Sequence, residues 1–76
     1  MYFIIEIQKN AEGQYLHLVY TAEDIYNADH QYHLVLSYAA ISDLPMHSVS
    51  MFTADGEPVK HEAYWHDITP SESAEE

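Results

Sequence analysis

The fold is decided by residues 21–45, which read TAEDIYNADHQYHLVLSYAAISDLP. Neither glycine nor proline interrupts residues 21–42, and apolar side chains recur at spacings of three, four and seven, as on one face of an amphipathic helix. Thr21 is expected to cap this helix by accepting a hydrogen bond from the Asp24 amide. Pro45 ends it, because the residue before a proline avoids the helical conformation. The helix is expected to span roughly 20 residues and to pack one of its faces against a sheet. That helix face consists of Ile25, Ala28, Tyr32, Val35, Leu36 and Ala39.

Strand patterns lie on both sides of this helix. Residues 2–8 and 15–20 are rich in β-branched and aromatic residues, and the polar residues 9–14 between them predict a hairpin. Residues 47–53 and 59–66 alternate in the same way around an Asp-Gly turn at residues 55–56. In the first strand Phe3, Ile5 and Ile7 share one face, which we interpret as the core side. The face left without a helix is then expected to carry Tyr2, Ile4, Tyr15, Val19, Phe52 and Tyr64.

These elements predict an α+β fold of ββ-α-ββ order, a four-stranded, mainly antiparallel sheet with one long helix packed on one face. Residues 1–68 form a single domain. Residues 69–76 are polar and acidic without periodicity, and are expected to be a disordered tail. The order of the strands in the sheet does not follow from the patterns.

The charge balance excludes several classes of partner. Thirteen acidic and two basic residues give a net charge of −11 over 76 residues, and cysteine is absent. Direct binding to nucleic-acid phosphates or anionic membranes needs Lys and Arg, so neither is expected. The absence of disulfides, of a long apolar segment and of a secretory signal pattern favours a cytoplasmic location.

The acidic residues themselves suggest a partner. Carboxylates spread over a folded domain, with Glu23, Asp24 and Asp29 the most prominent, can imitate the phosphates of nucleic acid. The partner would then be a basic nucleic-acid-binding protein. The alternative is that the charge only keeps the domain soluble.

A second apolar stripe on the predicted helix indicates an interface. Leu34, Tyr38 and Ile41 lie at i, i+4 and i+7, with His30 close by, on the side away from the sheet. An apolar line on the outer face of so small a domain favours a homodimer or contact with another protein.

The six histidines raise a metal-binding alternative, although no cofactor is expected. His30 and His33 are spaced i, i+3, so both imidazoles can reach one transition-metal ion. Further ligands would come from Asp29, from the remaining histidines of the C-terminal hairpin (His47, His61 and His66), or from a second subunit. These three and His17 are otherwise expected on strand surfaces. Pairs such as His33 with Asp29, or Ser50 near His47, stand in no catalytic motif, so an enzyme is not expected.

Three segments resemble a family of short uncharacterised bacterial proteins carried by prophage-like and conjugative elements. They are residues 1–8, residues 31–42 and residues 45–50, and the resemblance spans residues 1–66. The family has no established activity, so the resemblance implies only a setting. Accessory proteins of mobile DNA often regulate or inhibit a host nucleic-acid-handling system, as anti-CRISPR proteins do. The hypothesis is therefore a non-enzymatic acidic interaction protein. The alternatives are a metal-binding module on His30 and His33, or a homodimer with a purely structural role.

Overall fold

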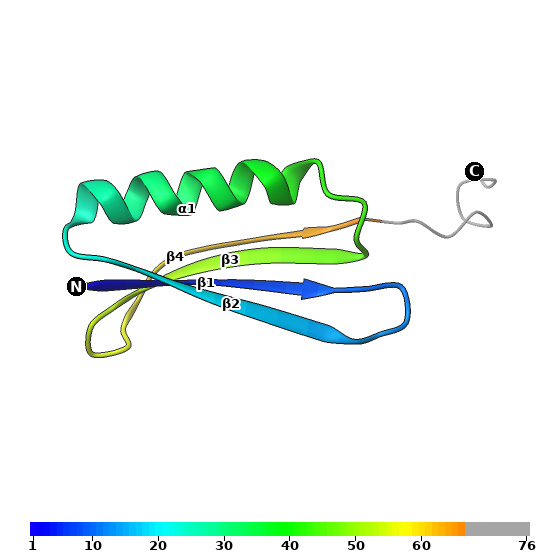
Figure 1. Ribbon diagram of the computed structural model, residues 1–76, viewed down its shortest axis with the longest axis horizontal. Coiled ribbons are helices and arrows are strands. Elements are labelled where there is room, and N and C mark those ends of the chain that lie inside the picture. Colours follow the sequence, from blue (N-terminus) through cyan, green and yellow to red (C-terminus); the bar gives the residue numbers. More distant parts are fainter. Residues whose placement is uncertain (67–76) are drawn as a thin grey trace.

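The computed structural model describes residues 1–66, and it has one sheet with a single helix lying across one face (Figure 1). The strands are β1 (Tyr2–Lys9), β2 (Tyr15–Ala22), β3 (Met46–Thr53) and β4 (Pro58–Trp65), and the helix is α1 (Ile25–Ala40). All three strand pairs are antiparallel. The predicted α+β, ββ-α-ββ fold is confirmed. The predicted tail at residues 69–76 lies outside the described residues.

The strand order is β2-β1-β3-β4, so β1 and β3 occupy the centre. The first hairpin places β2 on one edge of β1, and α1 then carries the chain back across the sheet to the other edge of β1. There β3 pairs along the whole of β1, from Tyr2 opposite Thr53 to Lys9 opposite Met46. Two glycines, Gly13 and Gly56, provide the positive φ angles of 83° and 90° that the hairpin turns require.

The helix begins later than predicted, and its cap is Asp24 rather than Thr21. Thr21 belongs to β2, which continues to Ala22 because Ala22 still pairs with Tyr2 in β1. The Asp24 carboxylate accepts hydrogen bonds from the backbone amide of Asn27 at 2.8 Å and from its side chain at 3.0 Å. The helix ends at Ala40, with Ile41 as the capping residue, whereas the sequence pattern predicts that it continues to about Ser42.

Replacing Asp24 with alanine should lower the melting temperature by a few degrees, because one free amide at the helix start loses its acceptor. Thr21→Ala is the matched control and should leave the melting temperature nearly unchanged. Thermal unfolding followed by far-UV circular dichroism measures both. A larger effect at Thr21 would mean that the helix starts where the sequence pattern placed it.

The core lies between α1 and the sheet. Its buried members are Ile4, Ala28, Tyr32, Val35, Val49 and Met51. The predicted helix face is correct for its four buried residues, while Ile25 at the helix start is exposed.

The predicted faces of β1 were wrong. Ile4 and Glu6 point towards the helix, and Phe3, Ile5 and Ile7 lie on the opposite side of the sheet. The alternation favoured the wrong side, because Phe3, Ile5 and Ile7 are all apolar whereas the helix side also carries Glu6 and Gln8. Pairing decides the matter, because Ile4 lies opposite Tyr20 in β2 and Met51 in β3, whose side chains face α1.

Candidate functional site

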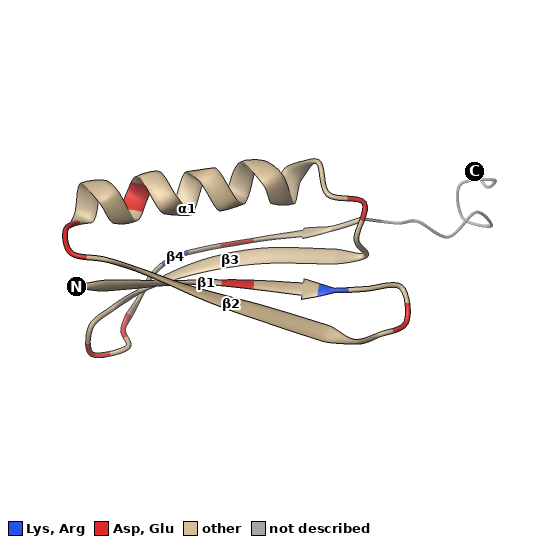
Figure 2. Cartoon of the chain, in the orientation of Figure 1, with Lys and Arg blue, Asp and Glu red and all other residues tan. Residues whose placement is uncertain are grey.

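Four carboxylates gather at one end of the molecule, which we call the acidic end. Glu23 and Asp24 lie in the connection from β2 to α1, and Asp55 and Glu57 lie in the β3–β4 turn (Figure 2). Both segments lie at this end because Tyr2 of β1 pairs with Ala22 on one side and with Thr53 on the other. The sequence predicted Glu23 and Asp24 as partner-binding residues but did not place Asp55 and Glu57 beside them, since that depends on strand order.

Local hydrogen bonds keep two of these carboxylates ionised. The backbone amide of Asn27, and then its side chain, lower the pKa of Asp24 below its ordinary value. The hydroxyl of Thr53 does the same for the pKa of Asp55, to which it donates a hydrogen bond. Both side chains are exposed, as are those of Glu23 and Glu57. The acidic end therefore presents negative charge directly to solvent.

The third predicted acid, Asp29, already has a partner. Its carboxylate pairs with Lys60 of β4, and His33 approaches the other oxygen at 3.5 Å. The hydrogen bond from Lys60 is the main cause of the lowered pKa of Asp29. Lys60 also lies over the ring of Tyr32, at 5.4 Å from its centroid. Asp29 thus joins α1 to the edge strand β4, and it contributes less free negative charge than the acidic end does.

The predicted second stripe on the helix is exposed. Leu34, Tyr38 and Ile41 have 39%, 59% and 82% of their surface accessible, and His30 is exposed beside them. Tyr26, at 84%, extends the line by one turn and was missed. Tyr26 precedes His30 by four residues, so the helical period could have predicted that it lies on the same line.

The two helix histidines do not meet a set of further ligands. Residues 1–66 hold no group of three or more His, Cys, Asp or Glu side chains placed to share a metal ion. Of the other ligands considered from the sequence, His47 is buried, His61 bonds to Ser50, and His66 approaches the carbonyl of Ala39. A site on His30 and His33 would therefore depend on a second molecule.

A buried polar cluster lies between the sheet and the helix, and the sequence did not predict it. Glu6 of β1 accepts hydrogen bonds from Gln8 at 2.8 Å, from the Tyr20 hydroxyl at 3.0 Å and from His47 Nε2 at 2.6 Å. His47 is buried instead of lying on a strand surface, and its Nδ1 has no partner among the described residues. Glu6, Gln8 and His47 lie on one face of the sheet because of the register in which β1 pairs with β3. The sequence alone does not give this register.

The negative charge of the cluster lies on the carboxylate of Glu6. Burial raises the pKa of this carboxyl, but the hydrogen bonds from Gln8, His47 and Tyr20 lower it further, so the net pKa lies below the ordinary value. Since the carboxylate can only accept, the Nε2 of His47 must carry the proton in their contact. Burial and the hydrogen bond to Glu6 raise the pKa of the Tyr20 phenol. The cluster is closed by its own bonds and stabilises the packing of β1 against β2 and β3.

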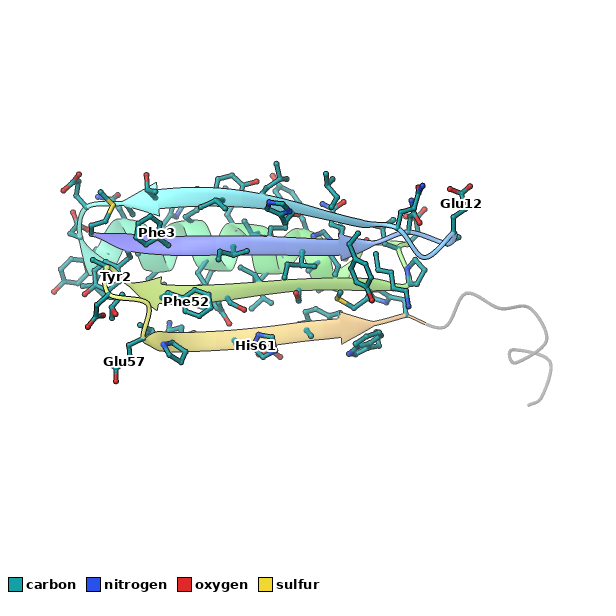
Figure 3. All side chains as sticks on the ribbon, turned by 90° about the horizontal axis from the view of Figure 1, so that it is seen from below. Tyr2, Phe3, Glu12, Phe52, Glu57 and His61 are labelled. Carbon is teal, nitrogen blue, oxygen red and sulfur yellow. The ribbon has the colours of Figure 1, made fainter. Side chains whose placement is uncertain are left out.

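The side of the sheet away from α1 is covered by no described element, and we call it the open face (Figure 3). Tyr15, Val19 and Phe52 lie on it as predicted, whereas Tyr2, Ile4 and Tyr64 belong to the helix side. By strand alternation the open face carries Phe3, Ile5, Ile7, Lys9, Tyr15, His17, Val19, Thr21, Met46, Ser48, Ser50, Phe52, His61, Ala63 and Trp65. None of these is acidic, in a domain that is otherwise rich in carboxylates.

One Ser-His contact stands on the open face. The hydroxyl of Ser50 lies 2.9 Å from Nδ1 of His61, so Ser50 is paired with His61 and not with His47. A nucleophilic pair also needs a group that orients the imidazole. Within residues 1–66 no carboxylate lies on this face, because Glu62 points to the helix side. The contact therefore has the geometry of a surface hydrogen bond rather than of a catalytic triad.

Comparison with known proteins returns no match to any family model, curated protein or solved structure. Within residues 1–66, α1 is neither long nor apolar enough to cross a membrane.

Proposed function

We propose that this chain is a non-enzymatic interaction protein that binds a basic nucleic-acid-binding protein through its acidic end. One observation carries the proposal. Four exposed carboxylates from two separate connections lie at the same end of the sheet, and neither lysine is placed to neutralise them. Lys60 is held by Asp29, and Lys9 lies at the opposite end of β1, 5.7 Å from the ring of Tyr15.

Charge of this kind acts on association before contact is made. Residues 1–66 hold nine acidic and two basic residues, so the described domain carries −7. Such a surface attracts a basic groove over several ångströms at low salt and competes there with phosphate groups. The acidic end would thus act as a nucleic-acid mimic. The resemblance to proteins of mobile elements supports a role as an accessory factor that inhibits a host defence component.

The test is the capture of bacterial proteins on the immobilised chain, at low and high salt and with duplex DNA as a competitor. Proteins retained by the acidic end should be released by both. The double variant Glu23→Lys/Glu57→Lys should weaken their binding by roughly tenfold or more, because both reversals fall in the contact. Neither side chain has a hydrogen-bond or ion-pair partner among the described residues whose loss would unfold the domain.

The matched control is Glu12→Lys/Asp43→Lys, which changes the net charge by the same amount at the other end of the sheet. It should weaken binding much less. Equal losses for the two double variants would show that net charge alone is responsible, and unchanged binding of Glu23→Lys/Glu57→Lys would contradict the proposal.

A further inference from the structure

The open face is large enough for a specific protein contact. It spans four strands of eight residues, which corresponds to roughly 19 by 26 Å, or about 500 Å² in projection, at the usual strand spacing and rise. Two such faces packed together bury about 1,000 Å² in projection, without the extra area that the uneven shape of the side chains contributes. Specific complexes begin at about 1,200 Å² of total buried surface. The projected area of two faces lies slightly below this value, and the uneven surface of the side chains adds to it.

Charge determines which surface two copies can share. Each described domain carries nine acidic residues and two lysines, so two copies repel each other unless the surfaces that meet are free of carboxylates. The strands of the open face carry no carboxylate, and they carry Lys9, His17 and His61. The one carboxylate at its margin is Asp55 of the β3–β4 turn, which lines a shallow hollow together with Phe3 and Phe52. The helix side includes Asp29 and Glu62, and its exposed stripe is one residue wide. The open face is therefore the better surface for self-association.

The side chains of the two central strands differ in size in a complementary way. β1 places Ile5 and Ile7 in the middle of the open face, and β3 places Ser50 and the buried Ser48 in the same two rows. A two-fold axis parallel to the strands, between β1 and β3, would lay each β1 over the β3 of the other copy. Each isoleucine then meets a serine, and sheets packed about 10 Å apart can interdigitate in this way.

We propose that the open face binds the open face of a second copy of this chain about that axis. The same axis places Trp65 against the partner's Tyr15, since both lie in the row that contains Lys9 and Met46. Trp65 is 70% exposed in the single chain, so the dimer would bury it. This inference goes beyond the proposed function, and it uses residues distinct from the acidic end.

Sedimentation equilibrium of the full chain tests the proposal. The wild-type chain should form a dimer as its concentration rises. Val19→Glu on β2 and Trp65→Glu on β4 should each raise the dimer dissociation constant by roughly tenfold or more, because each buries a carboxylate. Tyr38→Glu on the helix stripe adds the same charge and should have little effect. Val19 and Trp65 are more than half exposed, and far-UV circular dichroism checks that each variant is folded.

The single tryptophan gives an independent signal. Its emission should shift to the blue as wild-type chain and Tyr38→Glu become more concentrated, and should stay red-shifted in Val19→Glu. Added salt should strengthen the dimer, because it screens the repulsion between two acidic copies, whereas it should weaken binding to a basic protein. Failure of one proposal is thus separable from failure of the other. A wild-type chain that stays monomeric at all concentrations would overturn the proposal. It would also be overturned if Tyr38→Glu weakened the dimer as much as Val19→Glu and Trp65→Glu do, or if Tyr38→Glu alone weakened it.

Discussion

Replacing Glu6 with alanine is expected to lower the free energy of unfolding by about 2–4 kcal/mol, because buried hydrogen-bond donors are left without an acceptor. The substitution leaves the buried ring of His47 without its acceptor, and it removes the acceptor of Tyr20 and Gln8. Both nitrogens of His47 would then be unpaired, since Nδ1 has no partner in the native fold. Urea denaturation followed by far-UV circular dichroism measures the change.

The matched control is Glu62→Ala. Glu62 lies in the same row of the same face, separated from Glu6 by Val49 of β3, but it is exposed on the edge strand. Its replacement should change the free energy of unfolding by less than about 0.5 kcal/mol. Equal effects of the two substitutions would mean that the buried cluster contributes nothing beyond ordinary packing.

The pH dependence of stability gives a second measure of the same cluster. The folded-state pKa of Glu6 lies below its ordinary value of 4.5, so its contribution is fully present above that pH. The contribution is lost as the pH falls through the lower, folded-state pKa. Glu6→Gln cannot ionise, so its stability should fall less steeply with pH in that range. A parallel pH profile for wild type and Glu6→Gln would show that Glu6 gains no stabilisation as a carboxylate.

Replacing Ile4 with alanine is the other substitution with a large expected effect, about 2–5 kcal/mol. Ile4 is fully buried between Tyr20, Met51 and the helix. Removing three methyl or methylene carbons leaves a cavity that the surrounding strands and helix cannot close. The measurement is again urea denaturation, at a chain concentration low enough to keep the protein monomeric.

Ile5→Ala is the control, because it makes the same change at the next residue on the other side of the sheet. Ile5 is only half-buried on the open face, so the monomer should lose about 1 kcal/mol. The cost at Ile5 should grow with chain concentration if the open face becomes the interface between two copies. A larger loss at Ile5 than at Ile4 in the monomer would contradict the assignment of the two faces.

The two proposed surfaces are compatible in one assembly. An axis parallel to the strands keeps the same end of each sheet on the same side of the dimer. The acidic ends of the two copies would then lie at one end of the assembly and present eight carboxylates to a basic partner. Their mutual repulsion is the physical reason that dimer formation should respond to salt in the opposite direction from partner binding.

Local patterns were sufficient to predict the helix, the four strands and the two hairpin turns. The apolar residues of α1 recur with the helical period, and an Asp-Gly pair strongly favours a tight turn, so each of these features depends on neighbours in the chain. Even the exposed stripe of Leu34, Tyr38 and Ile41 could be read in this way. The helix cap was an exception, because Thr21 was retained by β2 through pairing with β1.

Tertiary structure alone decided the orientation of β1, the acidic end and the cluster around Glu6. The alternation of β1 favours burial of its more apolar side, Phe3, Ile5 and Ile7, whereas the helix covers the side that also carries Glu6 and Gln8. The hydrogen bond between Glu6 and His47, and the placement of residues 23–24 and 55–57 at the same end of the sheet, involve segments more than 30 residues apart. Such contacts exist only after β3 has paired with β1, and no local spacing in the chain encodes which strand edge β3 will choose.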